Sequence, residues 1–120
     1  MPRPRKLLKF LGDVAWSPVG EESSGTIRRA ILRNGEELVI GLASATGPYS
    51  LTLHRREGDD YEGTWSYRDG QQARSDSVTA TLYRAANDRV LLFGEWREDG
   101  EVYHWWAHFH AVESFPDERH

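Results

Sequence analysis

The segment that most constrains the fold is a predicted hairpin near the C-terminal end of the chain. Residues 91–96, LLFGEW, and residues 103–109, YHWWAHF, flank an Asp-Gly pair, which between apolar runs is typical of a two-residue type I′ turn. Side chains alternate between the two faces of a strand, so folding at this turn collects aromatic rings on one face. The pattern predicts a β-sheet with an aromatic core. The cross-strand pairs that the turn predicts are Trp96–Tyr103, Glu95–His104, Gly94–Trp105 and Phe93–Trp106.

Similar turn signals recur along the chain and divide it into short strands. No long helical pattern separates them, so consecutive strands can pair only as antiparallel hairpins. Seven strands, or eight if residues 14–17 join, are enough to close a small barrel. We therefore predict an all-β fold, a small antiparallel meander β-barrel of seven or eight strands with a short basic N-terminal arm or helix. The expected strands are 25–33, 36–44, 49–56, 61–68, 72–84, 89–97 and 102–112.

Both ends of the chain are expected to lie outside this barrel. Residues 1–24 are predicted to form an N-terminal arm and loop, and residues 25–112 the barrel domain. Residues 113–120, ESFPDERH, are predicted to form an acidic C-terminal tail that frays in solvent.

Composition excludes several classes of function. The chain has 120 residues, enough for one domain, and no cysteine, so a disulfide framework and a zinc–thiolate site are excluded. The net charge is −4, and the acidic body argues against a nucleic-acid groove. No apolar run approaches the roughly 20 residues of a membrane span, and no signal peptide is evident. We expect a cytoplasmic protein, and the excess of arginine over lysine suggests a bacterial one.

The interior can be predicted by carrying the parity of each turn from strand to strand. This pairs Ile31 with Leu38, Leu51 with Trp65 and Tyr67 with Gln72, and it places Ile31 inward. The inward positions are mostly apolar, which supports the register. At the end that holds the turns near residues 46, 69 and 99, the inward side chains are aromatic with a few polar groups, as in a small-molecule mouth. Arg29 is a further polar side chain placed inward. The predicted ligand-binding residues are Tyr49, Trp65, Tyr67, Arg74, Asp76, Trp96 and Tyr103.

The meander, the Gly63-Thr64-Trp65 strand and the aromatic interior resemble the up-and-down barrels of the lipocalin and avidin kind. The resemblance concerns the architecture of roughly residues 25–112. It implies binding of a small apolar or amphipathic molecule.

We therefore expect a barrel that binds an amphipathic ligand at its aromatic mouth, with the anionic or carbonyl group of the ligand on Arg74. One alternative is an enzyme of the cyclase or isomerase kind that uses Arg74, Asp76 or a tyrosine in the same mouth. Another is a protein-interaction module in which the rings only fill a solid core. Whether any reaction is catalysed stays open, and no cofactor is expected.

Three histidines near the end of the chain are candidate metal ligands. His104, His108 and His110 share one strand face with Glu95 near by, and a His-x-His spacing occurs in zinc sites. That face points outward in the predicted register, and the spacing alone is a weak motif. We therefore predict no metal site.

An outward apolar band is predicted beside the last hairpin. Leu91, Phe93 and Trp106 face outward together, and such a band needs a cover. Either the N-terminal arm, with Leu7, Leu8, Phe10 and Leu11, covers it, or a second subunit does, and we expect a homodimer. The outer face of the first hairpin is expected to extend the band with Ala30, Leu32, Val39 and Ala43.

Overall fold

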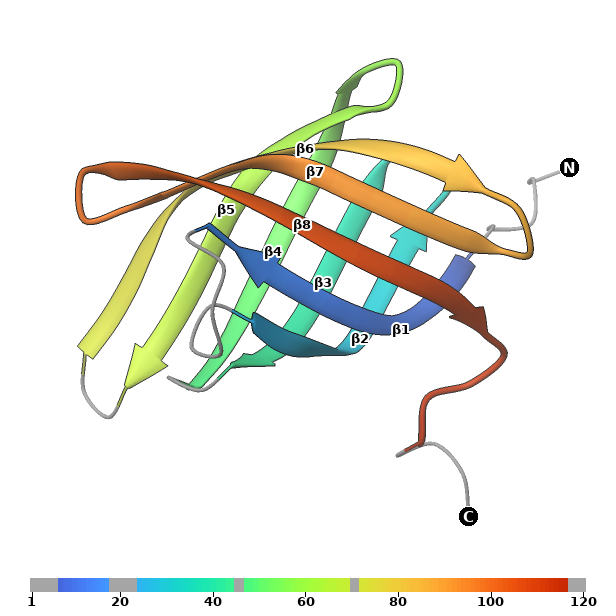
Figure 1. Cartoon of the computed structure of the whole chain (residues 1–120), viewed down its shortest axis with the longest axis horizontal. Helices are drawn as coiled ribbons and strands as arrows, with labels where there is room; N and C mark the ends of the chain where they lie inside the picture. The colour runs from blue at the N-terminus through green and yellow to red at the C-terminus, as the bar shows by residue number, and fades with distance from the viewer. Residues whose placement is uncertain (1–6, 18–23, 45–46, 70–71, 117–120) are drawn as a thin grey trace, which may run out of the picture.

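The chain folds into a closed antiparallel barrel of eight strands. The computed structural model describes residues 7–17, 24–44, 47–69 and 72–116. Each strand pairs with the next, and the last strand returns to the first (Figure 1). The predicted all-β meander is therefore confirmed. The strands are β1 (Leu7–Trp16), β2 (Ser24–Arg33), β3 (Glu37–Ser44), β4 (Gly47–Glu57), β5 (Asp60–Asp69), β6 (Gln72–Ala85), β7 (Arg89–Glu98) and β8 (Glu101–Val112).

The first strand is longer than the sequence predicted. Residues 7–11, expected in an arm or helix, form the first half of β1, which pairs with β2 on one side and β8 on the other. Phe10 and Val14 are buried inside the barrel, and Leu8 and Trp16 pack against the core. This period-two apolar pattern is that of a strand rather than a helix. β1 therefore closes the barrel, and Leu8 and Phe10, two of the residues considered as a cover for the outer band, pack inside it.

The predicted registers hold for two hairpins and shift for a third. In the last hairpin Gly94 lies opposite Trp105, as predicted, and Asp99 and Gly100 have positive φ angles of 53° and 79°. The β4–β5 pairs are also as predicted. In β5–β6 the pairing is shifted by two residues, so Tyr67 lies opposite Arg74 rather than Gln72. Two residues are a full period of a strand, so the inward face is unchanged.

The first hairpin departs from the prediction by one residue. Asn34 and Gly35 do occupy the turn, with φ angles of 52° and 69°. The pairing resumes at Arg33 opposite Glu37, however, so Leu38 faces Leu32 rather than Ile31. A shift of one residue exchanges the two faces of a strand.

A β-bulge at Arg28 then restores the predicted pairing. Ile27 lies opposite Leu42 and Arg29 opposite Gly41, so Arg28 is an additional residue in β2. Arg28 and Arg29 are consequently both exposed. Arg29 and Ile31, predicted inward, therefore lie on the outer face, whereas Ala30 and Leu32, predicted outward, are buried.

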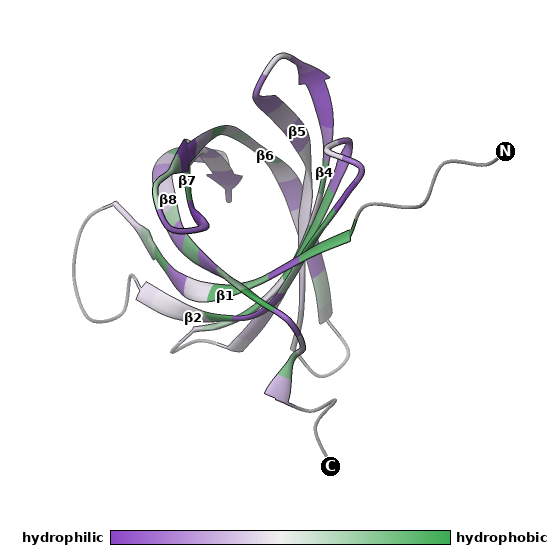
Figure 2. Ribbon diagram, turned by 90° about the vertical axis from the view of Figure 1, so that its right-hand side faces the viewer, coloured by the Kyte–Doolittle hydropathy of each residue, from purple (hydrophilic) through white to green (hydrophobic). Residues whose placement is uncertain are grey.

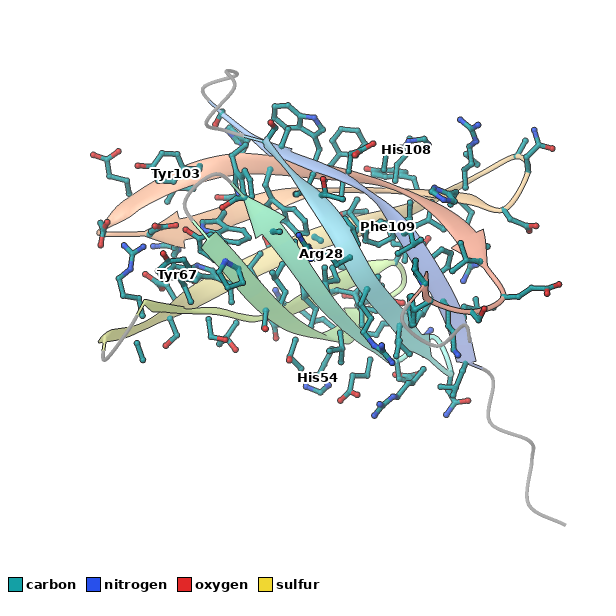
Figure 3. All side chains as sticks on the ribbon, turned by 90° about the horizontal axis from the view of Figure 1, so that it is seen from below. Arg28, His54, Tyr67, Tyr103, His108 and Phe109 are labelled. Carbon is teal, nitrogen blue, oxygen red and sulfur yellow. The ribbon has the colours of Figure 1, made fainter. Side chains whose placement is uncertain are left out.

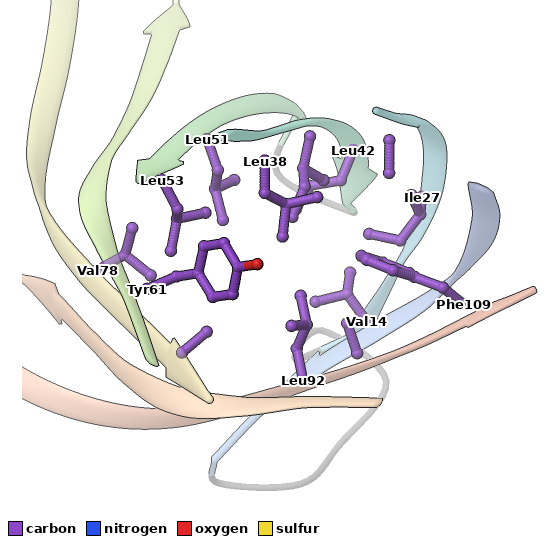
Figure 4. Close-up of a cluster of buried hydrophobic side chains, with 14 of the residues drawn as sticks. Val14, Ile27, Leu38, Leu42, Leu51, Leu53, Tyr61, Val78, Leu92 and Phe109 are labelled. Carbon is purple, nitrogen blue, oxygen red and sulfur yellow. The ribbon is translucent and has the colours of Figure 1, made fainter. Parts of the chain in front are cut away.

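The core is a continuous apolar cluster along the barrel axis. Figure 4 shows Leu38, Leu53 and Leu92 around the ring of Tyr61. Figure 2 shows the hydropathy alternating along the ribbons of the barrel, as expected when one face of each strand is buried. At Gly63 and Gly94 a Cβ atom would collide with the carbonyl oxygens of Thr52 and Thr79, so the neighbouring strands approach closely there.

The segment after β8 folds back onto the outside of the barrel. Phe115 is 1% exposed, with the guanidinium of Arg29 4.4 Å and the ammonium of Lys9 5.5 Å from its ring centroid. These cation–π contacts fix the tail to β1 and β2. The predicted fraying is therefore wrong for Phe115, and residues 117–120 lie outside the described residues.

Candidate functional site

Seven aromatic side chains gather at one end of the barrel, and we name them the aromatic cluster. In a meander, the connections after β1, β3, β5 and β7 lie at the same end, and β1, β4, β5, β7 and β8 each bring at least one inward ring there. Figure 3 shows Tyr67 and Tyr103 at this end. The cluster consists of Trp16, Tyr49, Trp65, Tyr67, Trp96, Tyr103 and Trp105.

Six of the seven rings of the aromatic cluster are linked by ring contacts. Trp65 and Trp96 stack with centroids 5.3 Å apart and planes 12° apart. Tyr49 contacts both indoles and also the rings of Trp16 and Tyr67, at 4.8–6.2 Å. Trp65, Trp96 and Trp105 are fully buried and form the floor of the site. The half-buried rings of Trp16, Tyr67 and Tyr103 form its rim.

The indole N–H groups of the floor all have acceptors. Trp65 Nε1 donates to Arg97 O at 2.7 Å, Trp96 Nε1 to Glu98 Oε1 at 2.9 Å, and Trp105 Nε1 to Thr79 O at 2.8 Å. These bonds orient the rings and satisfy the donors that burial removes from water.

Trp16 is the exception. Its Nε1 is buried without any hydrogen-bond partner, and it is the one buried side-chain nitrogen or oxygen in this condition among the described residues. The ring meets Trp96 edge-on at 5.3 Å. A buried donor without an acceptor costs about 1–3 kcal/mol, so this N–H is a destabilising feature at the rim of the site.

The backbone pairing between β6 and β7 stops beside the aromatic cluster. Their pairing ends at Val78 opposite Trp96, although β6 begins six residues earlier, at Gln72. Figure 1 shows the β7–β8 hairpin extending away from β5 and β6 at this end. Side chains bridge this unpaired stretch, which we name the β6–β7 seam. They are Trp65, through its bond to Arg97 O, and Arg74, through Glu98 and Asp99.

Arg74 has partners on both sides of the seam. Its Nη1 lies 3.4 Å from Glu98 Oε2 and 3.5 Å from Asp99 Oδ2, and its guanidinium lies 5.1 Å from the Tyr67 centroid. Glu98 thus accepts hydrogen bonds from Trp96 and forms an ion pair with Arg74. The guanidinium is already compensated, so a planar anion would compete with two carboxylates for it.

The rim is acidic at the β7–β8 turn. Glu98, Asp99 and Glu101 follow one another closely there. The carboxylate of Glu101, followed by burial and the carboxylate of Glu98, raises the pKa of the Tyr103 hydroxyl above its usual value. The local potential therefore disfavours an anion at this end.

The remaining predicted residue, Asp76, lies opposite Trp65. Its Oδ1 accepts a hydrogen bond of 2.7 Å from the backbone N–H of Ser77, so its orientation is set within its own strand. The structure thus places all seven predicted residues at one end of the barrel. The prediction missed Trp16, because the first strand was cut short, and Glu98, which the parity of Trp96 would have placed inward.

The opposite end of the barrel is closed by Tyr61. Its hydroxyl donates to Gly35 O at 2.7 Å, and the side chain is 4% exposed. Burial raises the pKa of this phenol, with the nearby Arg55 acting in the opposite direction. This end is built as a plug rather than a mouth.

The histidines of β8 lie on the outer wall of the barrel. His108 lies opposite Asp13 of β1, and no group of three His, Asp or Glu side chains suited to a metal ion occurs among residues 7–17, 24–44, 47–69 and 72–116. A groove of about 630 Å³ runs beside His108 and Trp106, with Ala15 and Thr26 in its lining.

Comparisons with known proteins leave the family of the chain open. No family model matches it, and no curated protein matches it. In the described part of the chain we find no helix with the length and apolar character needed to cross a bilayer.

Proposed function

We propose that the protein binds a small amphipathic molecule at the aromatic end of its barrel. The observation that carries the proposal is the aromatic cluster itself, in which half-buried rings of Trp16, Tyr67 and Tyr103 lie over a fully buried indole floor. Rings with one apolar face and one polar edge suit a ligand that is apolar over most of its surface.

The ligand enters at the β6–β7 seam in this proposal. The floor ring of Trp96 contacts those of Trp65 and Trp105, so a ligand needs a displacement of rim side chains rather than an empty channel. The seam lacks backbone pairing beyond Val78, and Arg74 bridges it through side-chain contacts alone. Exposed ion pairs are worth little, so this is the part of the wall that opens at least cost.

The experiment is a titration with N-phenyl-1-naphthylamine, a neutral fluorescent probe whose emission rises in apolar surroundings. We expect saturable binding at one probe per chain, with energy transfer from tryptophan. Trp65→Phe should reduce the transfer, whereas Trp106→Phe, on the outer wall, should leave most of it. Absence of saturable binding to the folded protein would overturn the proposal.

Arg74 and Arg84 provide a matched pair of variants for the entry route. Both lie on the inward-parity positions of β6, at opposite ends of the strand. Arg74→Ala should raise the association rate of the probe because it removes two ion pairs across the seam. Arg84→Ala should leave that rate unchanged. Equal effects of the two variants would exclude the seam as the entry.

We also propose that the protein forms a homodimer through Leu91, Phe93 and Trp106. Phe93 is 48% exposed and stacks edge-on against Tyr83, itself 52% exposed, at 5.8 Å. The groove beside Trp106 lies next to this protruding ring. A protrusion and a groove on one face suit an isologous contact, in which each copy fills the groove of the other.

Light scattering of wild type and Phe93→Glu tests the dimer. We expect a dimeric wild type and a monomeric, folded variant, because a carboxylate cannot be buried unpaired at the interface. Val102→Glu, which changes an exposed apolar residue elsewhere on β8, serves as the control and should remain dimeric. A monomeric wild type at high concentration would contradict the proposal.

A further inference from the structure

We infer that the ligand of the aromatic end carries an uncharged hydrogen-bond acceptor, such as a ketone or amide oxygen, and that this oxygen accepts the Trp16 indole N–H. The inference rests on the proposed ligand site and names the chemical class of its ligand. It begins from Trp16 Nε1, the one buried donor in the described residues that lacks a partner.

The other buried indoles at this end of the barrel all have hydrogen-bond acceptors, so Trp16 differs from its neighbours. Three other indoles, from Trp65, Trp96 and Trp105, each have an acceptor within 2.9 Å. The backbone around Trp16 is also satisfied. Ser17 N donates to His104 O, and His104 N donates to Ser17 Oγ. A single unpaired donor beside aromatic rings is the arrangement expected where a ligand supplies the acceptor.

The acceptor should be neutral because the negative charge near Trp16 is already high. Trp16 contacts Trp96, whose N–H is bonded to the Glu98 carboxylate, and Asp99 follows in the chain. Arg74, a cation at the seam, is shared by these two carboxylates. A ligand carboxylate beside Glu98 and Asp99 would therefore meet repulsion.

A chain of contacts connects the seam to Trp16. Arg74 forms an ion pair with Glu98, Glu98 accepts a hydrogen bond from the Trp96 indole, and the Trp96 ring packs edge-on against Trp16. A ligand that parts the Arg74–Glu98 pair thereby loosens the Trp96 ring against which Trp16 packs. The N–H becomes reachable in the same movement that admits the apolar body of the ligand.

The test uses three naphthalenes of similar shape as competitors of N-phenyl-1-naphthylamine. They are 2-acetylnaphthalene, with a ketone oxygen, 2-isopropenylnaphthalene, in which a CH₂ group replaces that oxygen, and 2-naphthoate, with a carboxylate. We expect the ketone to bind about tenfold more tightly than the alkene, a factor that corresponds to 1.4 kcal/mol. We expect the carboxylate to bind more weakly than the ketone.

Trp16→Phe should abolish the tenfold preference, because phenylalanine retains an aromatic ring and removes the donor. Trp105→Phe, whose N–H is already bonded to Thr79, should retain the preference. Should Trp16→Phe fail to fold, NMR of the wild-type protein with ¹⁵N-labelled tryptophan tests the same hydrogen bond. The Trp16 indole proton should move downfield with the ketone and stay in place with the alkene.

The outcomes separate this inference from the function on which it rests. Binding of all three naphthalenes without preference, or a Trp16 indole resonance that ignores the ketone, would overturn the inference and leave the ligand site standing. A preference for 2-naphthoate would likewise overturn it and would favour Arg74 as the partner of an anion. Failure of the fluorescent probe itself to bind would remove the ligand site.

Discussion

Truncation of Trp105 provides the sharpest test of the barrel interior, because the next residue in the chain, Trp106, serves as the control. Trp105 and Trp106 are neighbours on β8 and point to opposite faces. Trp105 is 1% exposed inside the barrel, whereas Trp106 is half-buried on the outer wall. The same substitution at the two positions therefore differs only in the face that it alters.

The magnitude follows from the burial of Trp105. A tryptophan side chain buries 150–250 Å², which at ~25 cal/mol per Å² corresponds to about 4–6 kcal/mol. Alanine retains part of this, and large-to-alanine substitutions in cores cost about 3–5 kcal/mol. Trp105→Phe keeps an aromatic ring but loses the bond to Thr79 O, so about 1–2 kcal/mol is expected. Trp106→Ala should cost about 1 kcal/mol.

Urea unfolding followed by far-ultraviolet circular dichroism measures these differences without relying on tryptophan emission. A shift of the midpoint at constant slope reports the change in the free energy of unfolding. If Trp106→Ala costs as much as Trp105→Ala, or more, then the face assignment of β8 is wrong. The register of the whole last hairpin would be wrong with it.

Three further predictions concern other parts of the barrel. Gly94→Ala should destabilise the protein by about 1–3 kcal/mol in urea unfolding, because the new Cβ would collide with the carbonyl oxygen of Thr79. Gly41→Ala is the control: its Cβ would meet no atom closer than 3.9 Å, so the substitution should be neutral or stabilising. The raised pKa of Tyr61 means that the folded state binds the phenol proton more tightly than the unfolded state does. The resulting stabilisation is present below pH 10 and is lost as the pH rises through the folded-state pKa. The free energy of unfolding should therefore fall less at alkaline pH in Tyr61→Phe than in wild type, and an equal fall would contradict the assignment. Phe115→Ala should free the tail from the outer wall and increase cleavage after β8 in limited proteolysis, and unchanged cleavage would mean that the ring does not hold the tail.

Local chemistry determined most of the architecture. Asp99-Gly100 adopts the positive φ angles that a type I′ turn needs, so the pairing of Trp96 with Tyr103 follows from the residues of the turn. The alternation of apolar residues in β4, β5, β7 and β8 then assigns the inward face. The gathering of predicted site residues at one end is a consequence of this parity and of the meander order.

Tertiary structure decided the features that parity cannot determine. The additional residue after Gly35 and the bulge at Arg28 each shift β2 by one position, and only pairing with β1 and β3 shows where they fall. A one-residue shift costs little within an isolated hairpin, but in a closed barrel it decides which side chains are buried. Ala30 and Leu32 are inside for that reason.

The details of the ligand site also depended on the closed barrel. The sequence places Arg74 and Trp96 at the same end, but the divergence of β6 from β7 lies in the three-dimensional pairing. That divergence brings Arg74 to Glu98 and Asp99. The unpaired N–H of Trp16 likewise emerges only when β1 is fitted against β8 and the surrounding rings, because hydrogen-bond satisfaction depends on every neighbour of a buried group at once.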